Sequence, residues 1–300
     1  MILWEPGEVA PGLHVLADAG VPSFLLDAEI SLLFDAGFAC MGPLYATEIR
    51  RVLGGRSPAF LLLTHSHFDH CGSASYLAGE FPGMRVGASP LAAKVFSRPT
   101  AMETIRFLNE NAARMVAEAK GAEVPDLACG DIALDLELSG GDEIQAGPGM
   151  TVRVLETPGH TRDCLSFFLP EMKALVCSEA AGIPDSTGAI ICDYLVDYDL
   201  FTASVEKLAA LDLDVICLGH ACVLTGGDAR SYLPEVLRQC QESKDMFERL
   251  LAEEHGDEER VTARVRALEY DPKPFPKQPE PAYLLNLAAR IAVMKKRMGG

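Results

Sequence analysis

Residues 65–70 have the sequence His-Ser-His-Phe-Asp-His and directly follow the apolar run 59–64. An unbroken apolar run of this length is typical of a strand buried on both faces. Only seven of the 300 residues are histidine, so three of them beside an aspartate in one short segment form a rare cluster. Layered α/β proteins place their sites at strand ends, and imidazole nitrogen and carboxylate oxygen suit Zn, Fe and Mn. The segment therefore predicts a metal site on a layered fold, rather than a cluster of hydrogen-bonded polar side chains.

Two more histidines also follow strand-like runs. His160 lies in Glu-Thr-Pro-Gly-His-Thr, and His220 lies in Cys-Leu-Gly-His. In both cases a preceding glycine permits a tight turn. Taken alone, either histidine would be read more readily as an ordinary hydrogen-bonded side chain. Together with the first cluster, both are predicted to be metal ligands.

Short apolar runs between turn residues alternate with helical segments over the first 230 residues. Strands are expected at 12–16, 23–26, 31–37, 59–64, 85–88, 132–138, 151–156, 165–169, 174–177 and 215–218, and helices at 43–54, 70–80, 100–120 and 199–210. Two successive blocks of strands and helices indicate a two-sheet core with helices outside, an α/β layered sandwich.

Beyond residue 230 the expected strands end. A long helix is predicted over 231–255 and a final helix over about 282–298, with an extended, proline-rich segment at 270–281 before it. We therefore expect a catalytic domain at residues 1–230, carrying a helical insertion at about 100–120, and a helical C-terminal extension at residues 231–300.

Composition narrows the classes of partner. The formal net charge of −17 repels phosphate backbones and anionic lipid headgroups, so we expect a small-molecule substrate and neither nucleic acid nor a membrane. The N-terminus lacks a basic start and a long apolar segment, and no run of eighteen apolar residues occurs. Nine cysteines without metal-finger spacing indicate reduced, buried thiols in a cytoplasmic protein. Cys71, next to the cluster, is expected to pack as a small hydrophobe and not to act as a nucleophile.

The order of these motifs resembles the metallo-β-lactamase superfamily over roughly residues 10–225. The chain has His-x-His-x-Asp-His, then Pro-Gly-His-Thr, then an apolar strand followed by a carboxylate, and then Gly-His. The resemblance implies a four-layer αβ/βα sandwich that binds two divalent metal ions (Zn, Fe or Mn). It assigns His65, His67 and His160 to one ion and Asp69, His70 and His220 to the other.

The sequence departs from the family at the residue that usually bridges the two ions. Members of the family commonly have an aspartate in a Gly-Asp pair there, whereas this chain has Cys-Ser-Glu-Ala at residues 177–180. Glu179 is therefore the expected bridge, or a ligand of one ion only, and Asp185 is the reserve candidate. A site that has lost one of its two ions is the alternative.

Within the superfamily, the cluster followed by Cys71-Gly72 and Tyr76-Leu77, the length and the helical extension look like the thioesterase branch that includes the quinolone-signal response protein. Members of that branch hydrolyse acyl-CoA-type thioesters or act in signalling. Glyoxalase II shares the histidine cluster more distantly. Its usual Gly-Gly is replaced here by Cys71-Gly72-Ser73, and its basic glutathione-binding segment is not evident.

The resemblance implies a binuclear hydrolase in which metal-bound hydroxide attacks a carbonyl ester. Asp69 would ligate one ion and orient the hydroxide. A thiolate, with a pKa of about 8.5, leaves without a dedicated acid, which favours an acyl-CoA-like thioester as substrate. The alternatives are a glyoxalase-II-like or lactone hydrolase and a signalling or regulatory protein that keeps a vestigial metal site and acts through partner binding. Whether the chain forms a homodimer stays open.

Overall fold

The computed structural model describes every residue except 1, 4, 18, 19, 122, 186, 221, 275, 276 and 300. The side chain of residue 120 is also outside the description. The chain divides into two compact units. The first comprises Met1–Glu156, Asp163–Ser178 and Leu213–Arg230, and the second comprises Thr157–Arg162, Glu179–Asp212 and Ser231–Gly300. Compactness defines these units, so the functional division at residue 230 stays a prediction.

One sheet of the first unit carries the strands that lead to the histidine cluster. Its order is β2-β3-β4-β5-β6-β7-β8, with β2 to β5 antiparallel and β5 to β8 parallel. The strands are β2 (Gly7–Ala10), β3 (Leu13–Leu16), β4 (Ser23–Leu26), β5 (Leu32–Phe34), β6 (Phe60–Leu62), β7 (Arg85–Ala88) and β8 (Leu136–Glu137). Because Phe34 is the register partner of Leu62, the residues that follow β5 and β6 emerge side by side at one edge.

The other sheet of this unit has the order β1-β16-β15-β12-β11-β10-β9. Its strands are β1 (Ile2–Leu3), β9 (Glu143–Gly147), β10 (Met150–Glu156), β11 (Leu165–Leu169), β12 (Ala174–Val176), β15 (Val215–Cys217) and β16 (Val223–Thr225). Only β12 and β15 run parallel here among the described strands, with Val176 opposite Cys217. The loops after these two strands, which carry Ser178 and His220, therefore begin at the same sheet edge.

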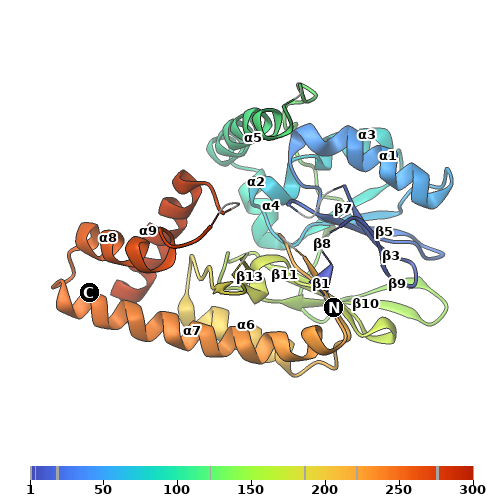
Figure 1. Ribbon diagram of the computed structural model, residues 1–300. Helices are drawn as coiled ribbons and strands as arrows, with labels where there is room; N and C mark the ends of the chain where they lie inside the picture. Colours follow the sequence, from blue (N-terminus) through green and yellow to red (C-terminus); the bar gives the residue numbers. More distant parts are fainter. Residues whose placement is uncertain are drawn as a thin grey trace. The chain divides into compact units, whose positions relative to one another are not determined.

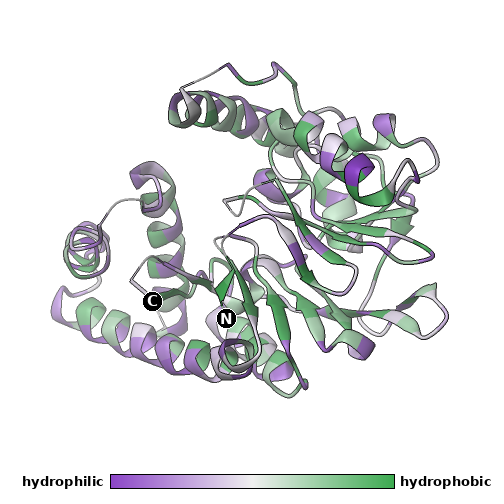
Figure 2. Ribbon diagram, turned by 45° about the vertical axis from the view of Figure 1, so that its right-hand side comes forward, coloured by the Kyte–Doolittle hydropathy of each residue, from purple (hydrophilic) through white to green (hydrophobic). Residues whose placement is uncertain are grey.

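The core of the first unit has two layers of apolar side chains. One lies between the two sheets, where the rings of Phe34 and Phe167 are 5.3 Å apart, and the strands are largely hydrophobic in Figure 2. The other lies between the first sheet and its helices, which are visible in Figure 1. These helices are α1 (Gly42–Leu53), α3 (Ala74–Glu80), α4 (Pro90–Phe96) and α5 (Pro99–Lys120). Helix α5 covers the residues predicted to form a helical insertion, and its status as an insertion stays a prediction.

Several local expectations differ from the structure. The helix expected over 70–80 is two helices, α2 (Phe68–Cys71) and α3, and the strand expected over 132–138 is only β8. Helix α4 was not expected, although the side chain of Ser89 caps it and a proline follows. Strand β9 was not expected either, because it lies at the edge of its sheet and its pattern is mixed, buried only at Ala146.

The second unit contains the C-terminal helices and a two-stranded hairpin. Its elements are β13 (Ile183–Pro184), β14 (Ile190–Ile191), α6 (Tyr198–Ala209), most of α7 (Gly227–Glu253), α8 (Glu258–Glu269) and α9 (Glu280–Arg297). The rings of Tyr270 and Tyr283, at the end of α8 and in α9, stack at 4.3 Å. The expected helical extension is therefore present. Of the extended segment expected at 270–281, residues 275 and 276 lie outside the described residues.

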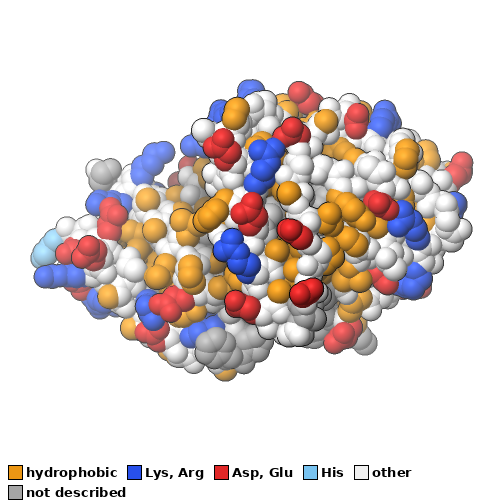
Figure 3. All heavy atoms as spheres, turned by 90° about the horizontal axis from the view of Figure 1, so that it is seen from above, with side chains coloured by type: hydrophobic (Ala, Val, Ile, Leu, Met, Phe, Trp, Pro, Cys, Tyr) orange, Lys and Arg blue, Asp and Glu red, His pale blue; other side chains and the backbone are white. Residues whose placement is uncertain are grey.

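Two further features are the apolar length of the helices and the distribution of charged side chains on the surface. Among the described residues, no helix is both long enough and apolar enough to cross a membrane. Figure 3 shows a face on which Asp and Glu side chains are interspersed with Lys and Arg side chains and with hydrophobic ones. On that face, the Asp and Glu side chains do not form one continuous acidic patch.

Candidate metal centre

The histidine cluster lies where β6 ends. His65 follows the strand, and His67 is still extended, with φ −67° and ψ 147°, before the chain turns into α2. Extended backbone followed by a helical turn brings the side chains together. The rings of His65 and His67 are 4.6 Å apart, and those of His65 and His70 are 4.4 Å apart. The cluster predicted from residues 65–70 is thus compact in space.

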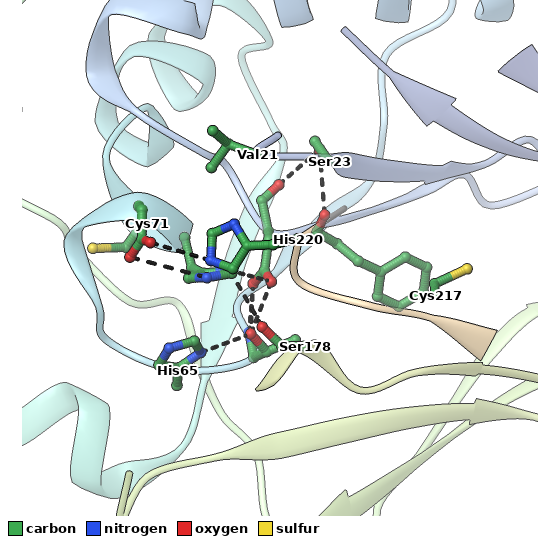
Figure 4. Close-up of polar contacts among 12 residues, drawn as sticks. Val21, Ser23, His65, Cys71, Ser178, Cys217 and His220 are labelled. Atoms are coloured by element: carbon green, nitrogen blue, oxygen red, sulfur yellow. Dashed lines mark hydrogen bonds and ion pairs between the residues drawn. The ribbon is translucent and has the colours of Figure 1, made fainter. Parts of the chain in front are cut away.

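His220 joins this cluster from the loop after β15. Its Nε2 lies 3.3 Å from Oδ2 of Asp69, and its ring is 5.3 Å from that of His70. Oδ1 of Asp69 is 4.0 Å from Nε2 of His70. In Figure 4, His65, Ser178 and His220 lie in one network of polar contacts. Asp69 therefore stands between two imidazole nitrogens that face it.

Asp35, which no sequence motif indicated, anchors the cluster from the end of β5. Its buried carboxylate accepts hydrogen bonds from the backbone N–H of Thr64 at 2.7 Å and from the Thr64 hydroxyl at 2.8 Å. The same carboxylate lies 2.9 Å from Nδ1 of His70. Asp35 has φ +57°, a conformation that aspartate tolerates better than most residues. The sequence offered one signal for this role of Asp35, because it is an acidic residue at the end of a buried strand, and that strand pairs with the one before the histidines.

In His220 and His160 the second ring nitrogen is also engaged. Nδ1 of His220 lies 2.7 Å from the carbonyl oxygen of Gly20, and Nδ1 of His160 lies 2.9 Å from that of Asp193. A carbonyl only accepts, so each Nδ1 donates, and the lone pair of each ring is on Nε2. Asp35 acts in the same way on His70. Fixing Nδ1 with a carboxylate or carbonyl is the arrangement that orients metal-binding histidines.

The described residues hold two groups that could bind metal ions. One consists of His65, His67 and His160, and the other of Asp69, His70, Glu179 and His220. Within each group, one ligand atom per residue lies within 4.8 Å of the others. Nitrogen and oxygen donors in groups of three and four, with the tautomers of His70, His160 and His220 fixed, fit a divalent ion such as zinc, iron or manganese.

The two candidate bridging carboxylates have different surroundings. Glu179 is buried in the 3-10 turn Ser178–Ala181, a short step after β12 ends. Asp185 belongs to neither group of described ligands. Its carboxylate lies 2.6 Å from Nζ of Lys273 and accepts from Thr187. Burial opposes ionisation of Asp185, but the Lys273 and Thr187 contacts outweigh it and lower the pKa of Asp185. Asp185 is thus held as one half of an ion pair.

Cys71 is fully buried in the core between the first sheet and its helices. Burial is the main cause that raises the pKa of its thiol well above the ordinary value. A thiol that stays protonated is a poor nucleophile, so the prediction that Cys71 packs as a hydrophobe is confirmed. All nine cysteines are free and buried, as expected.

The chain is similar in sequence and in fold to known proteins. The family model described as the metallo-β-lactamase superfamily matches residues 18–220. An uncharacterized protein of Mycobacterium bovis is 30% identical over 217 residues, which cover 68% of this chain and 86% of that protein. A hydroxyacylglutathione hydrolase of Ruegeria pomeroyi is 30% identical over 197 residues, covering 65% of this chain and 58% of that protein. A solved metallo-β-lactamase family protein from Thermus thermophilus has a TM-score of 0.65 at 20% identity, covering 98% of this chain and 95% of that one.

The chain therefore belongs to the metallo-β-lactamase superfamily, and the predicted fold, a layered α/β sandwich with a helical C-terminal extension, is confirmed. The more distant relationship to glyoxalase II, the hydroxyacylglutathione hydrolases, is confirmed as well. At this level the comparisons support a superfamily hydrolase with a metal site. The predicted role of each ligand, the identity of the metals and the substrate are proposals.

Proposed function

We propose that this protein is a metal-dependent hydrolase that cleaves a carbonyl ester, with an acyl-CoA-like thioester as the substrate class. The observation that carries the proposal is the pair of ligand groups, together with the fixed Nδ1 atoms of His70, His160 and His220. Relatives named hydroxyacylglutathione hydrolases support hydrolysis of an acyl substrate.

In this proposal His65, His67 and His160 hold one ion, and Asp69, His70, His220 and Glu179 hold the other. Two divalent cations would acidify a water molecule and polarise the scissile carbonyl. The protein's own side chains supply the geometry. The Nε2 atoms of His70 and His220 face Asp69, so its carboxylate has one oxygen toward each ring and is partly exposed. Asp69 can thus orient the attacking water and accept its proton.

A thioester fits these residues because its leaving group needs little help. A thiolate, with a pKa of about 8.5, departs without a proton donor. The thiol nearest in sequence to the ligands, Cys71, is buried and contacts the backbone oxygen of Ser66, which leaves it no place in the reaction. The proposed chemistry therefore uses the ligand groups and Asp69 alone, without a covalent enzyme intermediate.

The test combines elemental analysis of the purified protein with a panel of a thioester, a lactone and a phosphodiester. His67→Ala should abolish turnover and lower the metal content, because it removes one imidazole of a three-ligand group. His14→Ala is the matched control, since His14 lies in β3, outside both groups. It should leave metal content and turnover unchanged.

Three outcomes would contradict the proposal, the last of them in its substrate class alone. Unchanged turnover in His67→Ala would remove metal-dependent hydrolysis, and metal binding without turnover of any substrate would favour the regulatory protein that acts through partner binding. Turnover of the lactone alone would replace the thioester as substrate class.

A further inference from the structure

Asp193 connects the C-terminal extension to a predicted metal ligand. It lies in the loop between β14 and α6 and is 7% exposed. Its backbone oxygen is the atom that contacts Nδ1 of His160, at 2.9 Å. Its carboxylate accepts a hydrogen bond of 2.8 Å from the side-chain amide of Asn286, and Oδ1 lies 3.9 Å from Nε of Arg290. Asn286 and Arg290 are one helical turn apart on α9.

Arg290 is itself held by two other helices. It is 3% exposed, donates a 2.7 Å hydrogen bond to Glu269 of α8, and lies over the ring of Phe247 of α7 at 5.2 Å. Burial disfavours its charged form, but Glu269 and Asp193 outweigh burial and raise the pKa of Arg290. A permanently charged guanidinium inside the unit therefore has two carboxylates as its counter-charges, and one of them is Asp193.

The backbone around His160 is tied to the same loop. The N–H groups of Val196 and Asp197 donate to the carbonyl oxygen of Gly159 at 3.1 and 3.4 Å. The hydroxyl of Ser204 in α6 donates to the carbonyl oxygen of Pro158 at 2.8 Å. These bonds fix the main chain on either side of the loop. The Asp193 carbonyl then sets the rotation of the His160 ring, because it accepts the proton on Nδ1.

We propose that Asn286 and Arg290 are positioning residues for His160. By fixing the Asp193 carboxylate they aim its backbone carbonyl at Nδ1, which keeps the lone pair on Nε2 and holds the ring in its ligating orientation. The inference rests on the proposed metal-binding role of His160. It gives α9 a task in the metal centre beyond packing of the extension.

The test is titration of the metal-free protein with cobalt(II), followed by visible absorption, for wild type and Asn286→Ala. Alanine has a higher helix propensity than asparagine, so α9 should stay folded. Removal of a residue that directly holds a metal ligand costs about 10- to 100-fold in metal affinity. Asn286 acts on His160 through Asp193, so we expect a smaller effect, about 3- to 10-fold weaker binding of the ion held by His65, His67 and His160, with an altered spectrum. Binding of the other ion should be unchanged.

Two further variants sharpen the result. Asn286→Asp has nearly the same shape but places a second carboxylate against Asp193, so it should weaken the same ion more than alanine does. Lys295→Ala is the matched control, because Lys295 is also on α9 and pairs with Glu258 of α8 at 2.8 Å without reaching Asp193. It should leave both ions unaffected.

Equal cobalt affinities in Asn286→Ala and wild type would overturn the inference. So would equal losses in Asn286→Ala and Lys295→Ala, which would indicate general loosening of the helices, or a loss confined to the ion of the Asp69 group. If wild type binds no cobalt, the proposed function fails together with the inference. If wild type binds two ions and only the Asn286 result is negative, the inference alone fails.

Discussion

Asp35 illustrates how a single residue sets the chemistry of its neighbours. Its carboxylate receives both hydrogen-bond donors of Thr64 and faces Nδ1 of His70. The bond to the backbone of Thr64 fixes the start of the loop that carries the histidines, and the contact with Nδ1 selects the tautomer of His70. One buried side chain therefore determines both where the ligands are and which nitrogen is presented.

Asp35→Asn should impair metal binding without disturbing the backbone, because asparagine also tolerates a positive φ. If the asparagine amide turns its NH2 toward Nδ1 of His70, it favours the His70 tautomer with a proton on Nε2. A protonated Nε2 has no lone pair to bind a cation. We expect about 10- to 100-fold weaker binding of one ion, measured by zinc titration calorimetry.

Asp135→Asn is the control for this change. Asp135 accepts from the backbone N–H of Val86 at 2.8 Å, in the same sheet, and its replacement should leave zinc binding as in wild type. If Asp35→Asn bound zinc as tightly as Asp135→Asn, the proposed role of Asp35 would be wrong.

Among the elements, the turn that carries His160 depends on close packing against α6. Gly159 has φ +137°, and a Cβ there would lie 2.3 Å from Cα of Phe201 and 2.5 Å from its backbone nitrogen. Backbone atoms of a helix cannot move aside as a flexible side chain would. Glycine in the Pro-Gly-His-Thr motif is therefore required by the contact between turn and helix as well as by the turn itself.

Gly159→Ala should lower the free energy of unfolding by about 3 kcal/mol or prevent folding, because backbone strain and overpacking add together. Gly188→Ala isolates the strain, since Gly188 has φ +85° and a Cβ added there would have no atom within 4 Å. That variant should cost about 1 kcal/mol. Denaturant unfolding measures both. Equal losses in the two variants would show that the contact with Phe201 does not limit the turn.

At the scale of the whole molecule, the proposed ions link residues from many segments of the chain. Ligands drawn from the ends of several strands are far apart in an unfolded chain, so an ion that binds them favours the folded state. Stability should then depend on free metal, although the chain has its own apolar core between and beside the sheets.

Zinc should raise the unfolding temperature, and a chelator should reverse the rise. At a free concentration of 100 times Kd, each site adds about 2.7 kcal/mol. A protein carrying both His67→Ala and His220→Ala, one change in each group, should show little or no rise in differential scanning calorimetry. A rise of the same size in that variant would mean that zinc stabilises the fold from elsewhere.

Much of the fold, and the set of side chains that the structure brings together as candidate ligands, could be predicted from the sequence. The apolar run before His65, the glycines before His160 and His220, and the alternation of strands and helices are local patterns, and local patterns reflect burial and turn geometry directly. The same holds for the long C-terminal helices. Strand β9 has a mixed pattern and gave no such signal, because it is stabilised by pairing with β10 and not by a buried face of its own.

The supporting contacts depended on the tertiary structure. Asp35 meets His70 across 35 positions because β5 and β6 pair in a particular register, and Asn286 meets Asp193 across 93 positions because α9 packs onto that loop. Such contacts come from strand register and helix packing, which no short stretch of sequence encodes. The sequence by itself determined which side chains are candidate metal ligands, and the tertiary structure decided which nitrogen His70, His160 and His220 present and what holds it there.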